Sequence, residues 1–369
     1  MSKRRIPILI VGGGPVGLTA ALELHRRGLP VRVFERDTVR ESFSKALAIN
    51  PRTLKLLEAC GMTERLLGEG IKIHRLRIEV EGRRAVTLDL DQLDESYPFM
   101  LGLPQSRTES LLEACLSEHG IAVERGVEVQ DIELAGKEAR LTARRGAESL
   151  HLTSSCVLAA DGAHSTLRKA LGIAFPGSRA PQTFQMIDGE IAWDGAHDQV
   201  AIFLLQHRVL ATIPLPVANC YRFIAVEEDP LRRLPPGAKL VREDWRSSFQ
   251  VSYRLAERFS QGAVHLAGDA AHIHSPIGAR GMNLGIEDAC VFAQKVAAGG
   301  LASYGTERRA VASGVIALTR SFTGLIVAQG GLRRIVRDHV AWRLLGIPPV
   351  RRRALRGIAG LDHPNPVTS

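Results

Sequence analysis

The chain has 369 residues, of which 45% are hydrophobic and 24% are charged. This composition can bury one large core or two moderate ones, and it excludes a disordered chain. The formal charge is +9, but aromatic residues make up only 5% and no run interleaves them with basic residues, which argues against a dedicated nucleic-acid reader. The excess of arginine fits either a solvated surface or attraction for an anionic cofactor, substrate or membrane surface.

The five cysteines stand singly in the sequence, without a C-x-x-C pair or any paired spacing. This usage predicts reduced thiols in a cytoplasmic protein and indicates no zinc site, so no metal is expected. The apolar run near the N-terminus is too short for a signal peptide, because glycines follow at once. No stretch approaches the roughly 18 consecutive apolar residues of a spanning helix, and we therefore expect a soluble protein.

The N-terminal stretch predicts a dinucleotide-binding unit. A buried strand over 6–11 leads into a glycine turn at 12–17, a helix over 18–27 and a second strand over 31–34 that ends at Glu35. In this context a G-x-G-x-x-G pattern is typical of sites that hold a pyrophosphate at a helix N-terminus. Glu35 is expected to accept hydrogen bonds from an adenosine ribose. The pattern by itself fits FAD and NAD equally well.

Each glycine of the pattern has a separate expected role. Gly12 allows the tight turn, Gly14 lets a pyrophosphate approach the backbone, and Gly17 lets the helix and the strand pack closely. A glycine pattern alone is weak evidence, but here the strand, the helix and the acidic residue are all in register. We therefore predict dinucleotide binding.

Two later stretches also have an apolar strand that ends at an acidic residue. The strand over 157–160 leads to Asp161, and the strand over 264–267 leads to Gly-Asp with Asp269. A proline and several small residues separate Asp269 from a helix that begins near Gly281. A packed core does not require this arrangement, so we expect something flat and partly charged to lie against the backbone there. The stretch at Asp161 also fits a simple turn after a strand.

These three motifs, in this order and at these intervals, resemble those of the FAD-dependent aromatic hydroxylases of the p-hydroxybenzoate hydroxylase type, the class A flavoprotein monooxygenases. The resemblance rests on residues 12–17 (GGGPVG), 161–168 (DGAHSTLR) and 268–269 (GD), and it covers most of the chain. It implies an α/β fold: a Rossmann-like, glutathione-reductase-like FAD-binding domain, interrupted by a mixed or antiparallel β-sheet substrate domain, with helices at the C-terminus. It also implies tightly but non-covalently bound FAD and NAD(P)H as a transient reductant.

The resemblance assigns cofactor contacts residue by residue. Asp269 matches the carboxylate that holds the ribityl chain, Gln105 matches a glutamine near the flavin and pyrophosphate, and Val129 matches a residue beside the adenine. The Asp161 segment matches one thought to serve the encounter with the nicotinamide. The expected cofactor contacts are Gly12, Gly14, Pro15, Val16, Gly17, Glu35, Arg36, Lys45, Gln105, Val129, Asp161, Asp269, Pro276, Gly278, Gly281, Met282 and Asn283.

The flavin segment and one phosphate contact depart from the family pattern. Lys45 stands where the family has an arginine, so it supplies charge without the bidentate fork. The chain reads GARGMN where the family commonly has G-G-Q-G-(M/L)-N, which places Ala279 and Arg280 in unusual positions. Ala279 is expected to restrict movement of the ring, and the role of Arg280 stays open. Backbone N–H groups at the start of the following helix, near Gly281, can stabilise the negative charge of a reduced flavin.

Polar residues around this segment have simpler interpretations than catalysis. His272 and His274 alternate after a strand without a third ligand nearby, so packing or ring contact is preferred over a metal site. Glu287 and Asp288 are interpreted as first-turn acids favoured by the helix dipole.

Apolar alternation between 185 and 227 predicts an antiparallel substrate sheet, with a ligand cleft where two domains meet. The predicted domains are an FAD-binding domain over 1–74, 104–178 and 260–325, a substrate domain over 75–103 and 179–259, and a C-terminal helical tail over 326–369. Six side chains either line the cleft or form the core of the sheet: Phe99, Met100, Trp193, Phe203, Tyr221 and Phe223. The basic tail either packs on its parent domain or lies on an anionic membrane surface.

The resemblance implies an enzyme that uses NAD(P)H and O2 to hydroxylate a phenolic or other electron-rich aromatic substrate through a C4a-hydroperoxyflavin. No residue in the sequence can be named as the base for the phenol. An FAD-dependent reductase or epoxidase of an isoprenoid or lipid-like substrate is the alternative that the basic tail favours, and a flavin-binding protein without catalysis is another. The sequence indicates neither the substrate, nor NADH against NADPH, nor the oligomeric state.

Overall fold

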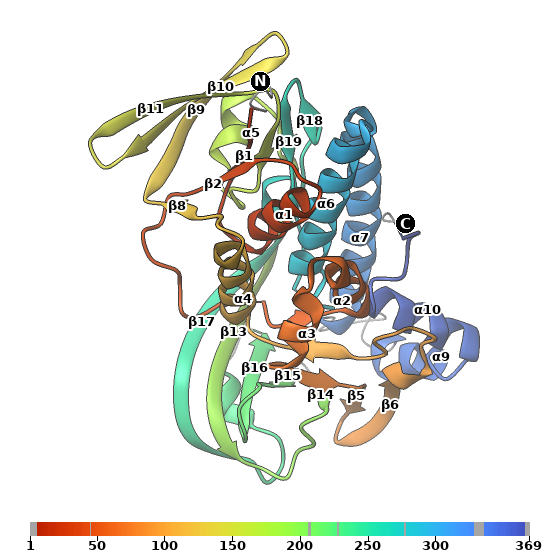
Figure 1. Ribbon diagram of the computed structural model, residues 1–369. Coiled ribbons are helices and arrows are strands. Elements are labelled where there is room, and N and C mark those ends of the chain that lie inside the picture. The colour runs from red at the N-terminus through yellow and green to blue at the C-terminus, as the bar shows by residue number, and fades with distance from the viewer. Residues whose placement is uncertain are drawn as a thin grey trace.

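The computed structural model describes residues 6–44, 46–205, 208–226, 229–276, 278–327 and 336–365. Its helices are α1 (Pro15–Arg26), α2 (Pro51–Leu57), α3 (Met62–Leu67), α4 (Gln105–Glu118), α5 (Thr166–Ala170), α6 (Arg280–Ala298), α7 (Tyr304–Ile326), α9 (Trp342–Leu344) and α10 (Pro348–Ile358), with a π-helical turn over Val336–Ala341. Figure 1 shows α1, α6 and α7 beside one sheet, and α9 and α10 beside another.

A six-stranded sheet brings the three predicted motifs together. Its strands, in spatial order, are β18 (Ser260–Gln261), β19 (Val264–Leu266), β12 (Val157–Ala159), β1 (Ile8–Val11), β2 (Val31–Glu35) and β8 (Val123–Arg125). Neighbouring strands are parallel except for β18, which is antiparallel to β19. Because parallel strands end at one edge, the segments that follow β19, β12 and β1 lie side by side. The predicted α/β class is confirmed.

The two faces of this sheet are covered by different partners. Ile8 and Ile10 of β1 pack with apolar residues of α1, α4 and α6. Leu9 and Val11 point to the opposite face and pack on an antiparallel sheet of β9 (Val127–Ala135), β10 (Glu138–Arg145) and β11 (Glu148–Ser154). A strand buried on both faces reads as a continuous apolar run, which is why 6–11 was predicted correctly as a strand.

Helix α1 begins at Pro15 rather than at the predicted Leu18. Proline is well suited to the first helical position, because its missing N–H has no intrahelical partner there and its φ is already helical. Gly14 is the N-cap residue, in an extended conformation. Gly17 therefore lies in the first turn of the helix and not in the loop before it.

An eight-stranded sheet forms the second large layer. Its spatial order is β20 (His272–Ile273), β17 (Lys239–Leu255), β13 (Gly177–Ala192), β16 (Cys220–Val226), β15 (Arg208–Pro214), β14 (Gln199–Leu205), β5 (Arg75–Val80) and β6 (Arg83–Asp89). β14 and β5 are parallel and the other neighbours are antiparallel, as expected for the mixed sheet. A third, small sheet consists of β3 (Ala48–Ile49), β7 (Met100–Gly102) and β4 (Ile71–Ile73), in that spatial order.

The described part of the C-terminal tail packs on the eight-stranded sheet. Ile326 and Trp342 join a core cluster with Ile78, Ile202 and other residues of the sheet. Leu355 of α10 is 2% exposed and joins a second cluster with residues of β4, β6 and β7. Part of the basic tail, residues 328–335 and 366–369, lies outside the described residues. Within the described ranges, no helix is both long and apolar enough to cross a membrane.

Candidate active site

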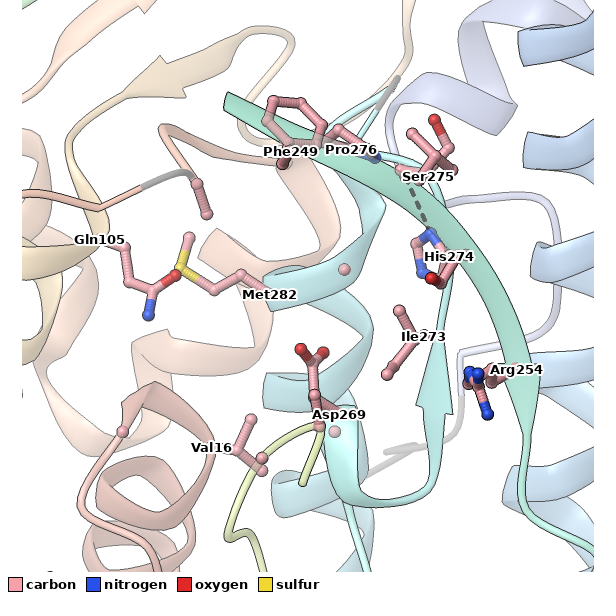
Figure 2. A pocket seen from close by; sticks show the side chains of 18 of the residues that line it. Val16, Gln105, Phe249, Arg254, Asp269, Ile273, His274, Ser275, Pro276 and Met282 are labelled. Carbon is pink, nitrogen blue, oxygen red and sulfur yellow. Dashed lines mark hydrogen bonds between the residues drawn. The ribbon is translucent and has the colours of Figure 1, made fainter. Parts of the chain in front are cut away.

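The segments that follow β1, β12 and β19 open into a cavity of about 1050 Å³. This exceeds the roughly 300–1,000 Å³ typical of small-molecule sites. Figure 2 shows side chains from several elements pointing into the cavity, with Asp269 between Met282 and Ile273. The predicted cofactor contacts that line it are Gly14, Pro15, Val16, Gln105, Asp269, Pro276, Gly281 and Met282.

The remaining predicted contacts lie elsewhere. Glu35 accepts a hydrogen bond from the Gly13 N–H at 2.7 Å, and Arg36 is an exposed side chain whose Nε lies 3.5 Å from Asp37. Val129 is buried in the core beneath the six-stranded sheet. These, with Gly12, Gly17, Asp161, Gly278 and Asn283, are not part of the cavity wall, and Lys45 lies outside the described residues.

The glycines of the first motif have distinguishable reasons for lacking a side chain. A Cβ on Gly12 would overlap the Ala160 carbonyl, and a Cβ on Gly17 would overlap the Gly12 carbonyl. A Cβ on Gly14 would meet only Glu109 Oε1, at 4.0 Å. Packing therefore requires Gly12 and Gly17, whereas the space above Gly14 is open to the cavity. This open cradle at the start of α1 fits a pyrophosphate group, which the N–H groups of a helix N-terminus can bind.

Asp269 has the geometry of an acceptor for hydroxyl groups. Its side chain is exposed where it faces the cavity, and among the described residues it has no hydrogen-bond partner. Surrounding protein raises the pKa of Asp269 through desolvation, and nearby His272 opposes that rise. A carboxylate that is exposed in a cavity and has no protein partner can accept hydrogen bonds from the hydroxyl groups of a ligand. Asp269 is therefore suited to accept hydrogen bonds from the hydroxyl groups of the FAD ribityl chain.

Asp161 has a local role at the next strand end. One carboxylate oxygen accepts a hydrogen bond from the Leu167 N–H at 3.1 Å, at the first turn of α5. The other oxygen is buried and has no partner among the described residues. Desolvation raises the pKa of Asp161. The neighbouring Gly162, Ala163 and His164 do line the cavity.

His274 is a neutral imidazole in the cavity wall. Its Nδ1 lies 3.0 Å from the Ser275 carbonyl, so Nδ1 carries the proton and donates (Figure 2). Burial and the neighbouring His272 lower the pKa of His274 to about 3. No group of three or more His, Cys, Asp or Glu side chains suited to a metal occurs in the described part of the chain. The interpretation that preferred packing over metal binding for His272 and His274 stays a prediction.

The Asn283 side chain forms hydrogen bonds within the protein that hold the first turn of α6 in place, so it does not point toward a ligand. The Asn283 amide oxygen accepts from the Asn50 N–H at 2.9 Å, and its NH₂ donates to the carbonyls of Ala48 and Ala279. Ala279 precedes the helix in the left-handed conformation, with φ 52°. Asn283 thus positions the helix start against β3 and α2, and Gly281 and Met282 of the same turn line the cavity.

Arg280 has a structural role that the sequence did not indicate. Its side chain is 3% exposed and donates to the Gly357 carbonyl at the end of α10 and to Asp362 at 2.7 Å. Arg52 donates to the carbonyls of His363 and Pro364, at 2.5 and 2.8 Å. The C-terminal segment is therefore fastened to the helix that borders the cavity.

The interpretation of Glu287 and Asp288 as first-turn acids was wrong. α6 begins at Arg280, and the first turn contains no acid. Both carboxylates are buried and bind Arg308 of α7, at 2.6 Å each. Burial alone would raise the pKa of Asp288, but the charges and hydrogen bonds of Arg308 and His272 together outweigh burial and lower that pKa.

Asp288 also connects this charge cluster to the cavity. Its Oδ2 accepts from the Gly268 N–H at 3.1 Å and lies 2.7 Å from His272 Nε2. Gly268 directly precedes Asp269, so the buried cluster positions the backbone from which Asp269 reaches the cavity.

His363 is expected to make the stability of this cluster depend on pH. Its Nε2 lies 2.7 Å from Glu287, and its Nδ1 lies 3.3 Å from Asp362. Burial alone would lower the pKa of His363, but these carboxylates outweigh burial and raise it. Charged His363 therefore stabilises the fold fully below its unfolded pKa of about 6.5, and this contribution is lost as the pH rises through the raised folded value.

We expect His363→Gln to lower the free energy of unfolding by about 1.5–3 kcal/mol at pH 6, and by less at pH 9. Urea unfolding at both pH values measures this difference. His151→Gln changes an exposed histidine of β11 and is the control, with no pH-dependent loss expected. An equal loss for His363→Gln at both pH values would contradict the ionic role of His363.

A second, apolar cavity of about 170 Å³ adjoins the large one. Residues Ala48, Ile213, Ile224, Pro276 and Ala279 line both cavities. The rest of the smaller cavity is formed mainly by one face of the eight-stranded sheet and by α7 and α10.

Of the six side chains considered for the cleft, Met100 lines the apolar cavity and the other five do not. Phe203, Tyr221 and Phe223 form a core cluster on the opposite face of the sheet, with Trp193 packed against it, and Phe99 belongs to the helix core. Successive strand residues point to opposite faces. The lining residues are therefore the sequence neighbours of these aromatics, such as Ile202 and Ile224. Alternation along each strand was the signal that could have identified the lining residues, because they occupy the positions between the aromatic residues.

Comparison with known proteins supports these observations. Residues 5–233 and 235–319 match the protein family described as FAD binding domain. The uncharacterized aromatic compound monooxygenase YhjG of Bacillus subtilis is 35% identical over 380 residues, which cover 96% of this chain and 75% of that protein. The 6-methylpretetramide 4-monooxygenase of Streptomyces rimosus is 30% identical over 384 residues, which cover 96% of this chain and 69% of that protein.

A solved structure extends the comparison to the fold. The crystal structure of p-nitrophenol 4-monooxygenase PnpA from Pseudomonas putida DLL-E4 superposes with a TM-score of 0.87 at 24% identity, and the match covers 97% of this chain and 98% of that one. The family match and the two relatives favour hydroxylation over the reductase or epoxidase alternative. The chain therefore belongs to the FAD-binding aromatic monooxygenases, as its resemblance to the hydroxylases of the p-hydroxybenzoate hydroxylase type predicted.

Proposed function

We propose that this enzyme binds FAD in the large cavity and hydroxylates a phenolic or other electron-rich aromatic substrate held in the apolar cavity, with NAD(P)H as reductant. The observation that carries the proposal is the shared wall of the two cavities, at residues such as Ala48, Pro276 and Ala279. A flavin ring at the start of α6 would therefore face an aromatic ring in a water-poor space.

The proposed FAD contacts divide into three groups along the large cavity. The start of α1 at Gly14 would hold the pyrophosphate through backbone N–H groups and the helix dipole. Asp269 would accept hydrogen bonds from the ribityl chain. The start of α6, at Gly281 and Met282, would stabilise negative charge on the reduced ring. Glu35 lies at the end of β2, where an adenosine ribose would reach it.

The chain's own contribution to the reaction is binding, orientation and exclusion of water. Bound FAD supplies the oxygen-transfer chemistry. The apolar walls keep water from the reacting atoms. Excluding water suppresses side reactions that would consume NAD(P)H and O₂ without hydroxylating the substrate. Among the described residues that line the apolar cavity, none is Asp, Glu, His, Lys or Tyr, so no side chain there is placed to act as a general base.

The test is a measurement of coupled turnover. Purified protein reconstituted with FAD should oxidise NAD(P)H faster when a phenol is added, and it should consume one O₂ for each NAD(P)H oxidised. The hydroxylated product should be detected by mass spectrometry. Anaerobic reduction of an alkene without phenol stimulation would instead support the reductase alternative. Neither activity from flavin-loaded protein would support the non-catalytic alternative.

Gly14→Ala tests the proposed position of FAD. Gly14 has φ −81°, which alanine adopts without strain, and its Cβ would enter open space in the cavity. We expect FAD affinity to fall by about tenfold or more, roughly 1.4 kcal/mol, with the unfolding free energy of the FAD-free protein changed by no more than about 0.5 kcal/mol. Isothermal titration with FAD and urea unfolding measure the two quantities.

Gly314→Ala is the matched control for this variant. Gly314 lies on α7, where a Cβ meets no atom within 4 Å, and alanine favours a helix. It should keep the FAD affinity of the unchanged protein. Unchanged FAD affinity in Gly14→Ala as well would rule out the proposed pyrophosphate position.

Several finer properties stay proposals. The division into an FAD-binding domain and a substrate domain is supported by the two large sheets. The six-stranded sheet draws all its strands from the predicted FAD-binding segments. The eight-stranded sheet draws its strands from the predicted substrate segments, except for β20 and the first two residues of β13. Cytoplasmic location rests on the cysteine usage alone. Weak membrane contact by the basic tail remains a prediction.

A further inference from the structure

We propose that the apolar cavity selects an uncharged aromatic substrate of a single ring, and that α7 and α10 set this size limit. The inference rests on the proposed function and adds the substrate class. Three observations carry it: the volume of the cavity, the absence of an available charge on its described walls, and the polar contacts that hold α10 in place.

The volume fits one ring with small substituents. The cavity holds about 170 Å³. An engineered protein cavity of about 150 Å³, lined by Leu, Ile and Phe, stays dry and binds benzene. A ring system of three or four fused rings is larger than the single ring that a cavity of this volume holds. It could gain the extra space only by entering the large cavity, where the FAD contacts lie, or by displacing a wall.

The walls of the apolar cavity disfavour a charged substrate. Arg75 is the only charged residue among the described residues that line the cavity, and its guanidinium forms an ion pair with Asp198. Its aliphatic stem can cover apolar surface while the charged end stays at the exterior. A substrate carboxylate would therefore be buried without a partner, which costs several kcal/mol. A neutral phenol avoids this penalty.

The wall opposite the sheet is held in place by polar contacts. Leu355 and Ile358 of α10 and Phe322 of α7 face the sheet residues across the cavity. Arg280 binds the Gly357 carbonyl beside them, and the charge cluster of Arg52, Glu287 and His363 fastens the chain that follows. Because several buried ionic contacts would have to break before α10 moved, the wall resists enlargement.

The size of the aromatic substrate is the first measurement. FAD-loaded enzyme is titrated with 4-methylphenol, 2-naphthol and 2-anthrol, and with 4-hydroxybenzoate as the charged single ring. Binding is measured by calorimetry without reductant, and kcat/KM by product formation with NAD(P)H. We expect 4-methylphenol to bind and react at least tenfold better than the other three. A comparable or better value for 2-naphthol, 2-anthrol or 4-hydroxybenzoate would overturn the inference.

Enlarging the cavity tests the size limit directly. Leu355→Ala should raise the ratio of kcat/KM for 2-naphthol over 4-methylphenol at least tenfold. Ile202→Ala enlarges the same cavity from β14, so a loosened α10 cannot explain the same result there. Phe203→Leu removes volume from the opposite face of the same strand and should leave the ratio unchanged. Unchanged ratios in both enlarged variants would overturn the assignment of these walls.

The binding measurement separates this inference from the proposed function. If 4-methylphenol binds selectively but no phenol is hydroxylated, the proposed function is wrong and the selectivity of the cavity stands. If larger phenols are hydroxylated in preference, the proposed function stands and the size limit is wrong. If no phenol of any size binds the FAD-loaded enzyme, both are wrong.

Discussion

Replacing Arg308 with methionine is expected to lower the free energy of unfolding by about 3–5 kcal/mol. The Arg308 side chain is 1% exposed, and it binds Asp288 and Glu287 at 2.6 Å each. Methionine would leave two carboxylates buried without their main cation, and their desolvation would no longer be compensated. Urea unfolding at neutral pH measures the loss.

The same change should also weaken FAD binding, although Arg308 does not line the cavity. Asp288 holds the Gly268 N–H, and a displaced Asp288 would release the backbone that carries Asp269. Arg309→Met is the control, because Arg309 is an exposed neighbour with one hydrogen bond, to the Ala256 carbonyl. It should cost about 1 kcal/mol or less. A similar cost for both variants would contradict the importance of the buried cluster.

Gly17→Ala is expected to destabilise the protein by about 3 kcal/mol or more, even without FAD. The added Cβ would overlap the Gly12 carbonyl and lie 3.2 Å from Ile10 Cγ2. The first of these neighbours is backbone, so α1 would have to move away from β1. Unfolding of the FAD-free protein, followed by circular dichroism, measures the effect.

The contrast with Gly14→Ala separates packing from ligand binding within one motif. Gly17→Ala should lower both stability and FAD affinity, whereas Gly14→Ala should lower only the affinity. FAD at 100 times its Kd should add about 2.7 kcal/mol to the stability of any variant that binds it normally. A Gly17→Ala protein as stable as the unchanged one would show that the close contact between helix and turn is not required.

Local pattern was sufficient for the nucleotide-binding layer. The strands at 6–11 and 157–160 were recognisable because a strand buried on both faces is a short apolar run. The strand at 264–267 follows the same pattern except at His265. Parallel pairing of β1, β12 and β19 then placed their following turns at one edge. Asp269 was found for the same reason, since a polar residue directly after such a strand lies at that edge.

Other parts of the site were misread because they depend on packing between distant segments. The aromatic residues of β14 and β16 attracted attention through their size, but the face that borders a cavity is decided by what covers each face of the sheet. Here α7 and α10, from the C-terminal end, cover the side of Ile202 and Ile224. Glu287 and Asp288 were misread because their partner Arg308 comes from another helix.

The sequence by itself determined the α/β class, the glycine turn after the first strand, and the apolar strands that lead to Asp161 and Asp269. These features are properties of short segments: hydrophobic periodicity, turn chemistry and the spacing of motifs. Only the tertiary structure decided which face of the substrate sheet borders the cavity, that Arg280 fastens the C-terminal segment, and that Asp288 supports the Asp269 backbone. Each of these depends on contacts between segments far apart in the chain. A buried polar or charged group needs a partner, but the local sequence around it does not show which distant residue that partner is.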